Sequence, residues 1–260
     1  MTTLETIKFF FSIDIIMPNY NKANYLEDSI KSVISQSLNN WNLFVIDDNS
    51  TDNSWEIIKK YSKFPNINSV RLRKNKGPAF CRNLGMRISK SKYISFIDSD
   101  DTWKTKKLEK QINFMEVNNF VFTYTDYTPF FEKYGVKKIK KPTALPKSFN
   151  FKTFTRNSSI NTTTMIVARS ILKTYRFKKI KLLEDYVFKC ALLKQNNKAK
   201  KFNEDLAYYR ILNYSRSSQR IKNVYWLWKV NKKFNNLNFV ENILSVFLIS
   251  LNSIKKYGIK

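Results

Sequence analysis

Four short apolar runs, separated by segments with helical spacing, constrain the fold of this 260-residue chain more than any other feature. The runs cover residues 13–17, 43–46, 67–72 and 93–97. Between them, apolar residues recur every three or four positions over 25–34, 55–61 and 77–88, as in amphipathic helices. Buried strands that alternate with helices through short links are typical of α/β proteins. We therefore predict an α/β fold with a mostly parallel, doubly wound, Rossmann-like sheet flanked by helices.

The second half of the chain has a looser pattern. Residues 132–152 are rich in lysine and contain Pro142 and Pro146, which predicts an irregular segment. We expect a strand over 161–168, a helix after 182–185 and a strand ending at 208–210. Residues 219–260 have helical spacing and are basic. The predicted organisation is one main domain over 1–218 and a helical, basic extension over 219–260.

The formal net charge of +27 and the absence of histidine are the main features of the composition. Such a charge suits binding to nucleic acid or to an anionic membrane surface, and it also follows from codon usage that enriches lysine. Without histidine, a general base must be a carboxylate or a less usual group.

Neither the N-terminus nor the cysteines indicate export. The first apolar stretch is interrupted by Asp14 and ends at Pro18, unlike a signal peptide, and no apolar run is long enough to cross a bilayer. Cys81 and Cys190 stand far apart and form no disulfide framework or metal-binding spacing. We expect a cytoplasmic protein in a reducing compartment.

Two carboxylates stand two residues apart directly after the fourth apolar run. Alternate residues of an extended backbone point the same way, so Asp98 and Asp100 can approach one hard cation, Mn²⁺ or Mg²⁺, that also binds a diphosphate. Alternatively, Asp100 or Asp101 caps a helix that begins near Trp103. The position favours the metal, because ligands of such sheets bind outside the carboxyl ends of the strands.

Acidic and aromatic residues also follow the first two runs. Asp48 could accept a hydrogen bond from the imide N–H of a uracil, and Tyr20 could stack on that base. Alternatively, Asp47 and Asp48 cap the next helix and Tyr20 is an ordinary half-buried aromatic. The chain places five cations around Gly77, namely Arg71, Arg73, Lys74, Lys76 and Arg82. They suit phosphate charge, although a solvated basic face is the commoner explanation for any one of them.

A further acidic pair, Glu184-Asp185, stands at the expected start of a helix. The helix dipole alone would favour acidic residues there. In a chain without histidine, the pair is also the best-placed source of a carboxylate base in the second half.

Together these motifs resemble those of the inverting nucleotide-sugar glycosyltransferases of family two, which have the GT-A fold. The resemblance runs from Ile13 to about Arg216. Its motifs are Pro18-Asn19-Tyr20-Asn21, Asp47-Asp48-Asn49-Ser50-Thr51-Asp52, Asn75-Lys76-Gly77, Ala79-Phe80-Cys81-Arg82-Asn83, Tyr93-Ile94-Ser95-Phe96-Ile97-Asp98-Ser99-Asp100-Asp101, Glu184-Asp185-Tyr186 and Tyr209-Arg210.

The resemblance implies that the protein transfers a hexose from a nucleotide donor, expected to be a UDP-sugar, to a hydroxyl of a saccharide or lipid-linked acceptor. It also implies Mn²⁺ or Mg²⁺ as cofactor. Relatives of this kind commonly build surface polysaccharide or lipopolysaccharide. The resemblance also implies the roles of individual residues. Pro18, Tyr20 and Asp48 would contact the donor base, and Arg82 would contact the diphosphate. Asp98 and Asp100 would lie at the ribose, the diphosphate and the metal, with Asp100 as the direct metal ligand. Asp185 would be the general base.

The chain departs from the family pattern after the Tyr-Arg pair. Many relatives have a histidine there, whereas Ile211-Leu212-Asn213 follows Arg210 in this chain. Asn213, Tyr214 or Arg216 would have to replace that histidine, and we expect weaker metal binding as a result.

Two other functions fit part of the pattern. A basic nucleic-acid-binding protein would explain the charge and the aromatic residues at 225–228, but acidic motifs cluster where phosphate would lie, so no nucleic-acid partner is expected. A nucleotidyltransferase on a similar core would release pyrophosphate instead of UDP.

The C-terminal segment suggests a contact with a membrane. A helix from Asn238 could turn one apolar face toward an anionic membrane at its inner surface, with Lys255 and Lys256 near the headgroups, or could pack this face on the core. The residues of this face are Phe239, Ile243, Val246, Phe247 and Leu251.

Overall fold

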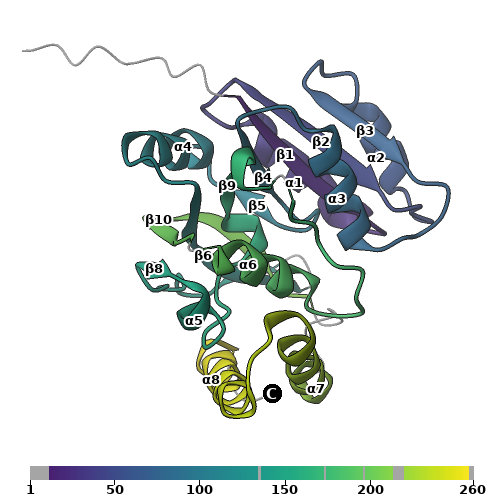
Figure 1. Cartoon of the computed structure of the whole chain (residues 1–260). Coiled ribbons are helices and arrows are strands. Elements are labelled where there is room, and N and C mark those ends of the chain that lie inside the picture. The colour runs from purple at the N-terminus through teal and green to yellow at the C-terminus, as the bar shows by residue number, and fades with distance from the viewer. Residues whose placement is uncertain (1–11, 134–135, 173, 196, 213–219, 258–260) are drawn as a thin grey trace, which may run out of the picture.

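The computed structural model describes residues 12–133, 136–172, 174–195, 197–212 and 220–257 (Figure 1). Its centre is a ten-stranded sheet whose main path runs β3-β2-β1-β4-β9-β6-β10-β5. The first four strands of the chain are β1 (Ile13–Asn19), β2 (Trp41–Asp47), β3 (Ile67–Arg71) and β4 (Tyr93–Phe96). They pair in parallel, as the four apolar runs predict.

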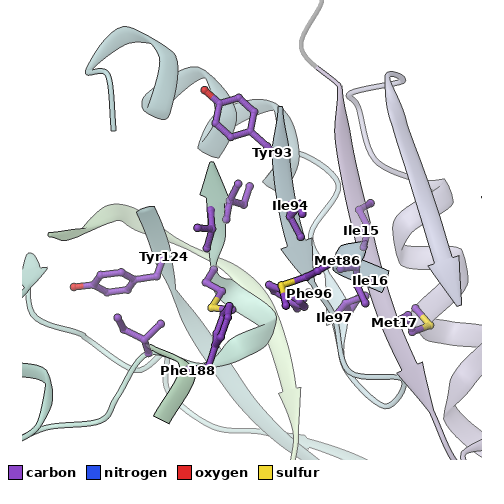
Figure 2. Close-up of a cluster of buried hydrophobic side chains, with 14 of the residues drawn as sticks. Ile15, Ile16, Met17, Met86, Tyr93, Ile94, Phe96, Ile97, Tyr124 and Phe188 are labelled. Atoms are coloured by element: carbon purple, nitrogen blue, oxygen red, sulfur yellow. The ribbon is translucent and has the colours of Figure 1, made fainter. Parts of the chain in front are cut away.

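Three helices connect these strands: α1 (Ala23–Ile34), α2 (Ser54–Tyr61) and α3 (Pro78–Ile88). Strand β1 is covered on both faces, because Ile15 and Ile16 point to opposite sides of the sheet and neither is accessible to solvent. Helix α3 approaches β1 so closely that a Cβ on Gly85 would lie 2.5 Å from Cγ2 of Ile16. Figure 2 shows the resulting core, in which Ile16, Met86 and Phe96 lie together.

The sheet becomes mixed beyond β4. Strand β9 (Ile166–Ala168) is antiparallel to both β4 and β6 (Phe122–Lys133). Strand β6 is parallel to β10 (Ala199–Arg210), and the short β5 (Thr102–Trp103) is antiparallel to β10. Helices α4 (Lys107–Val117), α5 (Phe151–Phe154) and α6 (Glu184–Lys194) belong to this half. The predicted α/β class, with a sheet flanked by helices, is confirmed.

Two predictions for the second half are wrong in part. The strand expected over 161–168 is a strand only at β9, because Thr162–Thr164 forms a 3-10 turn in which Asn161 Oδ1 accepts from Thr163 N. Local side-chain hydrogen bonds of this kind compete with strand pairing. The segment expected to be irregular contains β7 (Val136–Ile139), which pairs with β6, and β8 (Ser148–Phe149), which pairs with β10. Lysines on an exposed edge strand hide its strand character.

The C-terminal part is helical, as expected. It comprises α7 (Arg220–Val230), a π-helical segment η4 (Asn231–Asn235) and α8 (Phe239–Tyr257). The predicted domain boundary at residue 218 lies outside the described residues. Of the helices that the structure describes, none combines the length and the hydropathy needed to cross a bilayer.

Candidate active site

The carboxyl ends of β1, β2 and β4 bring three of the predicted motifs together. Asn19 and Asp47 are partners in the β1–β2 register, and Asp48 N donates to Asn19 O at 2.8 Å. On the other side of β1, Ile97 N donates to Ile16 O at 3.1 Å, which places the residues that follow β4 beside the end of β1. The three strand ends therefore form one site, as the doubly wound pattern predicts.

Asp47 and Asp48 both have structural partners. Asp47 is fully buried and accepts hydrogen bonds from Asn19 Nδ2 at 2.9 Å and Ser50 Oγ at 2.6 Å. The two carboxylate oxygens of Asp48 accept from the backbone N–H groups of Lys76 and Gly77, at 2.7 Å each. The Cys81 thiol is a further hydrogen-bond partner of this carboxylate. A carboxylate has about four lone-pair sites, so one more N–H donor could still be accepted.

The alternative reading of these aspartates as helix caps is wrong. Helix α2 begins at Ser54, and the carboxylate at its start belongs to Asp52, whose Oδ1 accepts from Ser54 N at 3.0 Å. Asp48 instead fixes the turn that opens α3, where Gly77 has φ +85°. Only glycine adopts that conformation without strain.

Pro18 and Tyr20 lie at the same strand end. Pro18 is buried near the end of β1. The pairing of β1 with β4 stops at Ile16, so the missing N–H of Pro18 costs no hydrogen bond to β4. Tyr20 follows the strand and has 46% of its surface exposed. Its ring is thus available for contact with a ligand.

A basic hollow adjoins Asp48. It has a volume of about 490 Å³ and is lined by Arg71, Leu72, Arg73, Lys74 and Lys76. The guanidinium of Arg71 lies 5.4 Å from the centre of the Trp55 ring and donates to Ser50 O at 3.0 Å. The predicted cations at this turn therefore gather on one side of the strand ends, apart from Arg82, which lies deeper.

Asp98 and Asp100 each carry an ion pair. Arg82 Nη2 lies 2.7 Å from Asp98 Oδ1, and Lys22 Nζ lies 2.7 Å from Asp100 Oδ2. Burial raises the pKa of Asp100, and the nearby Lys22 acts against it. Among the described residues, Nε and Nη1 of the buried Arg82 have no hydrogen-bond acceptor, so this guanidinium keeps donors for an anion.

The third acid of this motif has a purely structural environment. Asp101 is fully buried and accepts from Thr163 Oγ1 at 2.5 Å and from the backbone N–H of Arg210 at 2.9 Å. The Arg210 guanidinium in turn donates to Asp100 O at 2.9 Å. The alternative of a helix cap at this point is wrong, because Trp103 lies in β5 and α4 begins only at Lys107.

The carboxylates of Asp98 and Asp100 suit a hard divalent cation, which commonly takes one or two protein carboxylates together with substrate phosphates. Within the described part of the chain, no cluster of three or more acidic or thiol side chains could bind a metal ion by itself. The residues therefore fit a cation that is shared with a diphosphate. Asn213, Tyr214 and Arg216, the candidates for replacing the missing histidine, lie outside the described residues.

Asp185 lies in the first turn of α6, presented by an unusual backbone. Leu183, which precedes the helix, has φ +67°, a left-handed conformation that is strained for a branched side chain. Asp185 Oδ2 lies 2.8 Å from Lys189 Nζ and accepts from Thr162 Oγ1 at 3.4 Å. Burial raises the pKa of Asp185, but the Lys189 ammonium outweighs it and lowers this pKa to about 2.

Arg82 connects the two groups of carboxylates. Its Nη1 lies 3.7 Å from Glu184 Oε1, while its Nη2 contacts Asp98. Burial lowers the pKa of Arg82, but the surrounding carboxylates raise it overall, so the guanidinium stays charged. The acidic start of α6 and the aspartates after β4 thus lie on two sides of one buried cation.

Sequence reasoning missed two lysines of this site. Lys22 directly follows the 18–21 motif, and nothing local to it indicates a contact with Asp100, 78 residues away. Lys189 could have been found, because residues four apart on a helix are neighbours and it stands four after Asp185. It is buried, and its Nζ also donates to Ile160 O at 2.7 Å.

Solved structures of GT-A glycosyltransferases share this fold. Residues 1–349 of S. aureus TarS in complex with UDP-GlcNAc match with a TM-score of 0.69 and 17% identity over 94% of this chain and 73% of that one. Intact TarS is longer, and this chain covers 43% of it. The mannosyltransferase PcManGT of Pyrobaculum calidifontis, in complex with GDP-Man and Mn²⁺, matches with a TM-score of 0.67 and 14% identity over 95% and 76%. The fold is therefore GT-A.

Sequence comparison identifies the family. The model of glycosyl transferase family 2 matches residues 14–180. WfaP of Escherichia coli, a UDP-Glc:alpha-D-GlcNAc-diphosphoundecaprenol beta-1,3-glucosyltransferase, is 31% identical over 245 residues, which are 94% of this chain and 95% of WfaP. The chain belongs to glycosyl transferase family 2 and is a glycosyltransferase.

Proposed function

We propose that this chain transfers a hexose from a UDP-sugar to a hydroxyl of a saccharide or lipid-linked acceptor, with inversion at the anomeric carbon, in the synthesis of surface polysaccharide or lipopolysaccharide. The observation that supports it most is the buried Arg82, which contacts Asp98 on one side and lies 3.7 Å from Glu184, next to Asp185, on the other. A diphosphate at Asp98 and a hydroxyl at Asp185 would thus be held on either side of one cation.

In this proposal the donor lies along the three strand ends. Tyr20 stacks on the base, Asp48 accepts from its imide N–H, and Pro18 also contacts the base. The spare donors of Arg82 bind the diphosphate. UDP as the carrier is supported by the UDP-Glc of WfaP and the UDP-GlcNAc complex of TarS. WfaP, which acts on alpha-D-GlcNAc-diphosphoundecaprenol, is also an example of a relative with a lipid-linked acceptor.

A Mn²⁺ or Mg²⁺ ion, held by Asp100 and Asp98, would stabilise the charge that grows on the departing diphosphate. PcManGT, whose structure contains Mn²⁺, supports a divalent ion in this fold. The chain's own contribution on the acceptor side is proton transfer. Asp185 takes the proton of the acceptor hydroxyl as that oxygen attacks the anomeric carbon from the side opposite the diphosphate. A single displacement of this kind inverts the anomeric centre and needs no enzyme nucleophile.

A release screen tests the proposal. Purified protein is incubated with a panel of nucleotide sugars, Mn²⁺ and saccharide or lipid-linked acceptors, and free UDP and pyrophosphate are measured. We expect UDP release that falls by about 100-fold or more in Asp185→Asn, as for loss of a general base, and strongly in Asp100→Ala. Glu56→Gln, which alters an exposed acid on α2, is the matched control. Unimpaired turnover in Asp185→Asn would overturn the base assignment, and pyrophosphate as the product would show a nucleotidyltransferase.

An acceptor that ends in a lipid is presented at a membrane. The proposal therefore includes peripheral contact of the protein with an anionic membrane at its inner, cytoplasmic face. It includes no nucleic-acid partner, and tight, salt-dependent binding of oligonucleotides would argue against that part.

A further inference from the structure

The two most deeply buried side chains of helix α8 are polar, which is unusual for a surface helix. Asn242 is 2% exposed and Ser245 is inaccessible. Both meet Asn231 of the π-helical segment, whose Nδ2 donates to Asn242 Oδ1 at 3.1 Å and to Ser245 Oγ at 2.8 Å. Ser245 Oγ also donates to Thr155 O at 2.5 Å. These paired polar groups fix the rotation of α8, because turning it would leave them buried without partners.

The outward face of α8 is apolar. Its exposed residues are Phe239, Val240, Ile243, Phe247, Leu251 and Ile254, with Phe239 69% and Phe247 58% exposed. No charged residue occurs between Glu241 and Lys255. Val246, by contrast, faces inward and packs on the core, so the predicted apolar face is divided between core and solvent. A contiguous exposed apolar stripe of this kind marks an interaction surface.

The stripe continues onto α7. The rings of Trp228 and Phe239 pack edge to face with centres 5.7 Å apart. Tyr225, 54% exposed, has Lys229 Nζ 4.4 Å from its ring centre. Rings with a polar edge and lysines with long apolar stems are the side chains suited to the boundary between hydrocarbon and headgroups. Figure 1 shows α7 and α8 side by side at one end of the molecule, beyond α6.

The charges around the stripe distinguish between partners. The exposed ionic side chains described on α7, η4 and α8 are Lys222, Lys229, Lys232, Lys233, Lys255 and a single acid, Glu241. In a symmetric dimer, this face would meet its own copy and bring lysines near lysines. An anionic bilayer offers apolar depth together with opposite charge.

We propose that the outward faces of α8 and α7 dock on an anionic bilayer, with α8 lying in the interface and the lysines among the headgroups. The polar network that orients α8 reaches the candidate active site, because Tyr186 Oη donates to Asn231 Oδ1 at 2.8 Å and Tyr186 follows Asp185. Docking thus fixes the height of Asp185 above the membrane. The consequence for the acceptor rests on the proposed function: the acceptor is a saccharide anchored in the bilayer, and it reaches Asp185 from the docked face.

Liposome flotation of the full-length chain tests the docking. We expect the protein to float with vesicles of mixed zwitterionic and anionic lipid, and about tenfold less with zwitterionic vesicles or in about 0.5 M salt, where the Debye length is only a few ångströms. The double variant Ile243→Glu/Phe247→Glu should lose flotation about tenfold. Both side chains are exposed, so the fold is kept. Phe64→Glu changes a phenylalanine that lies beside Tyr61, far along the chain from α8, and is 44% exposed, compared with 58% for Phe247. It is the control variant and should float like the wild type.

Two flotation results would each overturn the docking: failure of the full-length protein to float with anionic vesicles, or unchanged flotation of the double variant. A stable dimer in solution that the same double variant disperses would assign the face to a second copy and also overturn it. UDP release to a water-soluble saccharide acceptor is measured in parallel and should be unchanged in the double variant. Absence of UDP release in the wild type, with flotation intact, would sink the proposed function and the acceptor delivery while leaving the docking.

Discussion

Replacing Lys189 with methionine should change the pH dependence of UDP release. The Lys189 ammonium lies 2.8 Å from Asp185 Oδ2 and is the main group that lowers the pKa of this carboxyl against the effect of burial. Methionine keeps the volume of the side chain and removes its charge. Arg82 stays nearby and, like the lost lysine, lowers the pKa of Asp185. The neighbouring Glu184 is itself a carboxylate and cannot replace the lost positive charge. The pKa of Asp185 should therefore rise.

The size of the shift follows from the same contact. With Lys189 present, the pKa of Asp185 is about 2, compared with an ordinary 3.8, which is roughly a 60-fold reduction in proton affinity. Because 39% of the Asp185 side chain is exposed, solvent screens part of the interaction. We expect the acid limb of kcat/KM in Lys189→Met to lie at least about one pH unit above that of the wild type.

Initial rates of UDP release between about pH 2 and 7, with the donor varied, would measure this limb. Lys194→Met is the matched control, because Lys194 is on the same helix and its Nζ also donates to a backbone carbonyl, that of Phe234. Methionine at 189 leaves Ile160 O without its donor, so circular dichroism at each pH must show that the variant is folded. Superimposed acid limbs of folded wild type and Lys189→Met would refute the role of Lys189.

Three further changes have expected outcomes of their own. Lys22→Met should bind Mn²⁺ several-fold tighter in a titration followed by electron paramagnetic resonance, because the ammonium 2.7 Å from Asp100 Oδ2 competes for that carboxylate; equal affinity would show no competition. Gly85→Ala should lower the free energy of unfolding in urea by about 1–3 kcal/mol, because its Cβ would lie 2.5 Å from Ile16 Cγ2. Burial lowers the pKa of Lys107 to about 7 from 10.5. Between about pH 7 and 10.5 the unfolded chain therefore binds one proton that the folded chain does not. Wild-type stability should rise with pH across this range by roughly 5 kcal/mol more than that of Lys107→Met, as measured by urea denaturation.

The half of the fold that holds β1 to β4 was predictable because its signals are local. Apolar runs bounded by turn residues identify β1 to β4, and parallel strands must place their carboxyl ends at one edge. The second half depends on contacts between distant residues. Strand β9 lies antiparallel between β4 and β6, whose paired residues are about 70 and 40 positions away in the chain. A three-residue strand has no periodicity that could specify these partners or their direction.

The same distinction holds for the site. The acids at the strand ends are visible in the sequence, but the cations that neutralise them are not, since Lys22 and Arg210 reach the Asp100 region only through the fold. Helical spacing correctly indicates that α8 has an apolar face. Which way this face points is decided by Asn242 and Ser245, whose partners Asn231 and Thr155 belong to other elements. A pattern of spacing cannot contain that information.

Every carboxylate that the proposed reaction uses at the diphosphate or the acceptor has a protein cation in contact with it. The pairs are Asp98 with Arg82, Asp100 with Lys22 and Asp185 with Lys189. Each of the three pairs is neutral by itself, so an incoming diphosphate does not meet bare aspartates at these positions. The same cations are then within reach of its oxygens, because lysine and arginine exchange one oxyanion partner for another at little cost. In a chain without histidine, this pairing is the physical reason to expect a weaker dependence on the metal than two unpaired aspartates would impose.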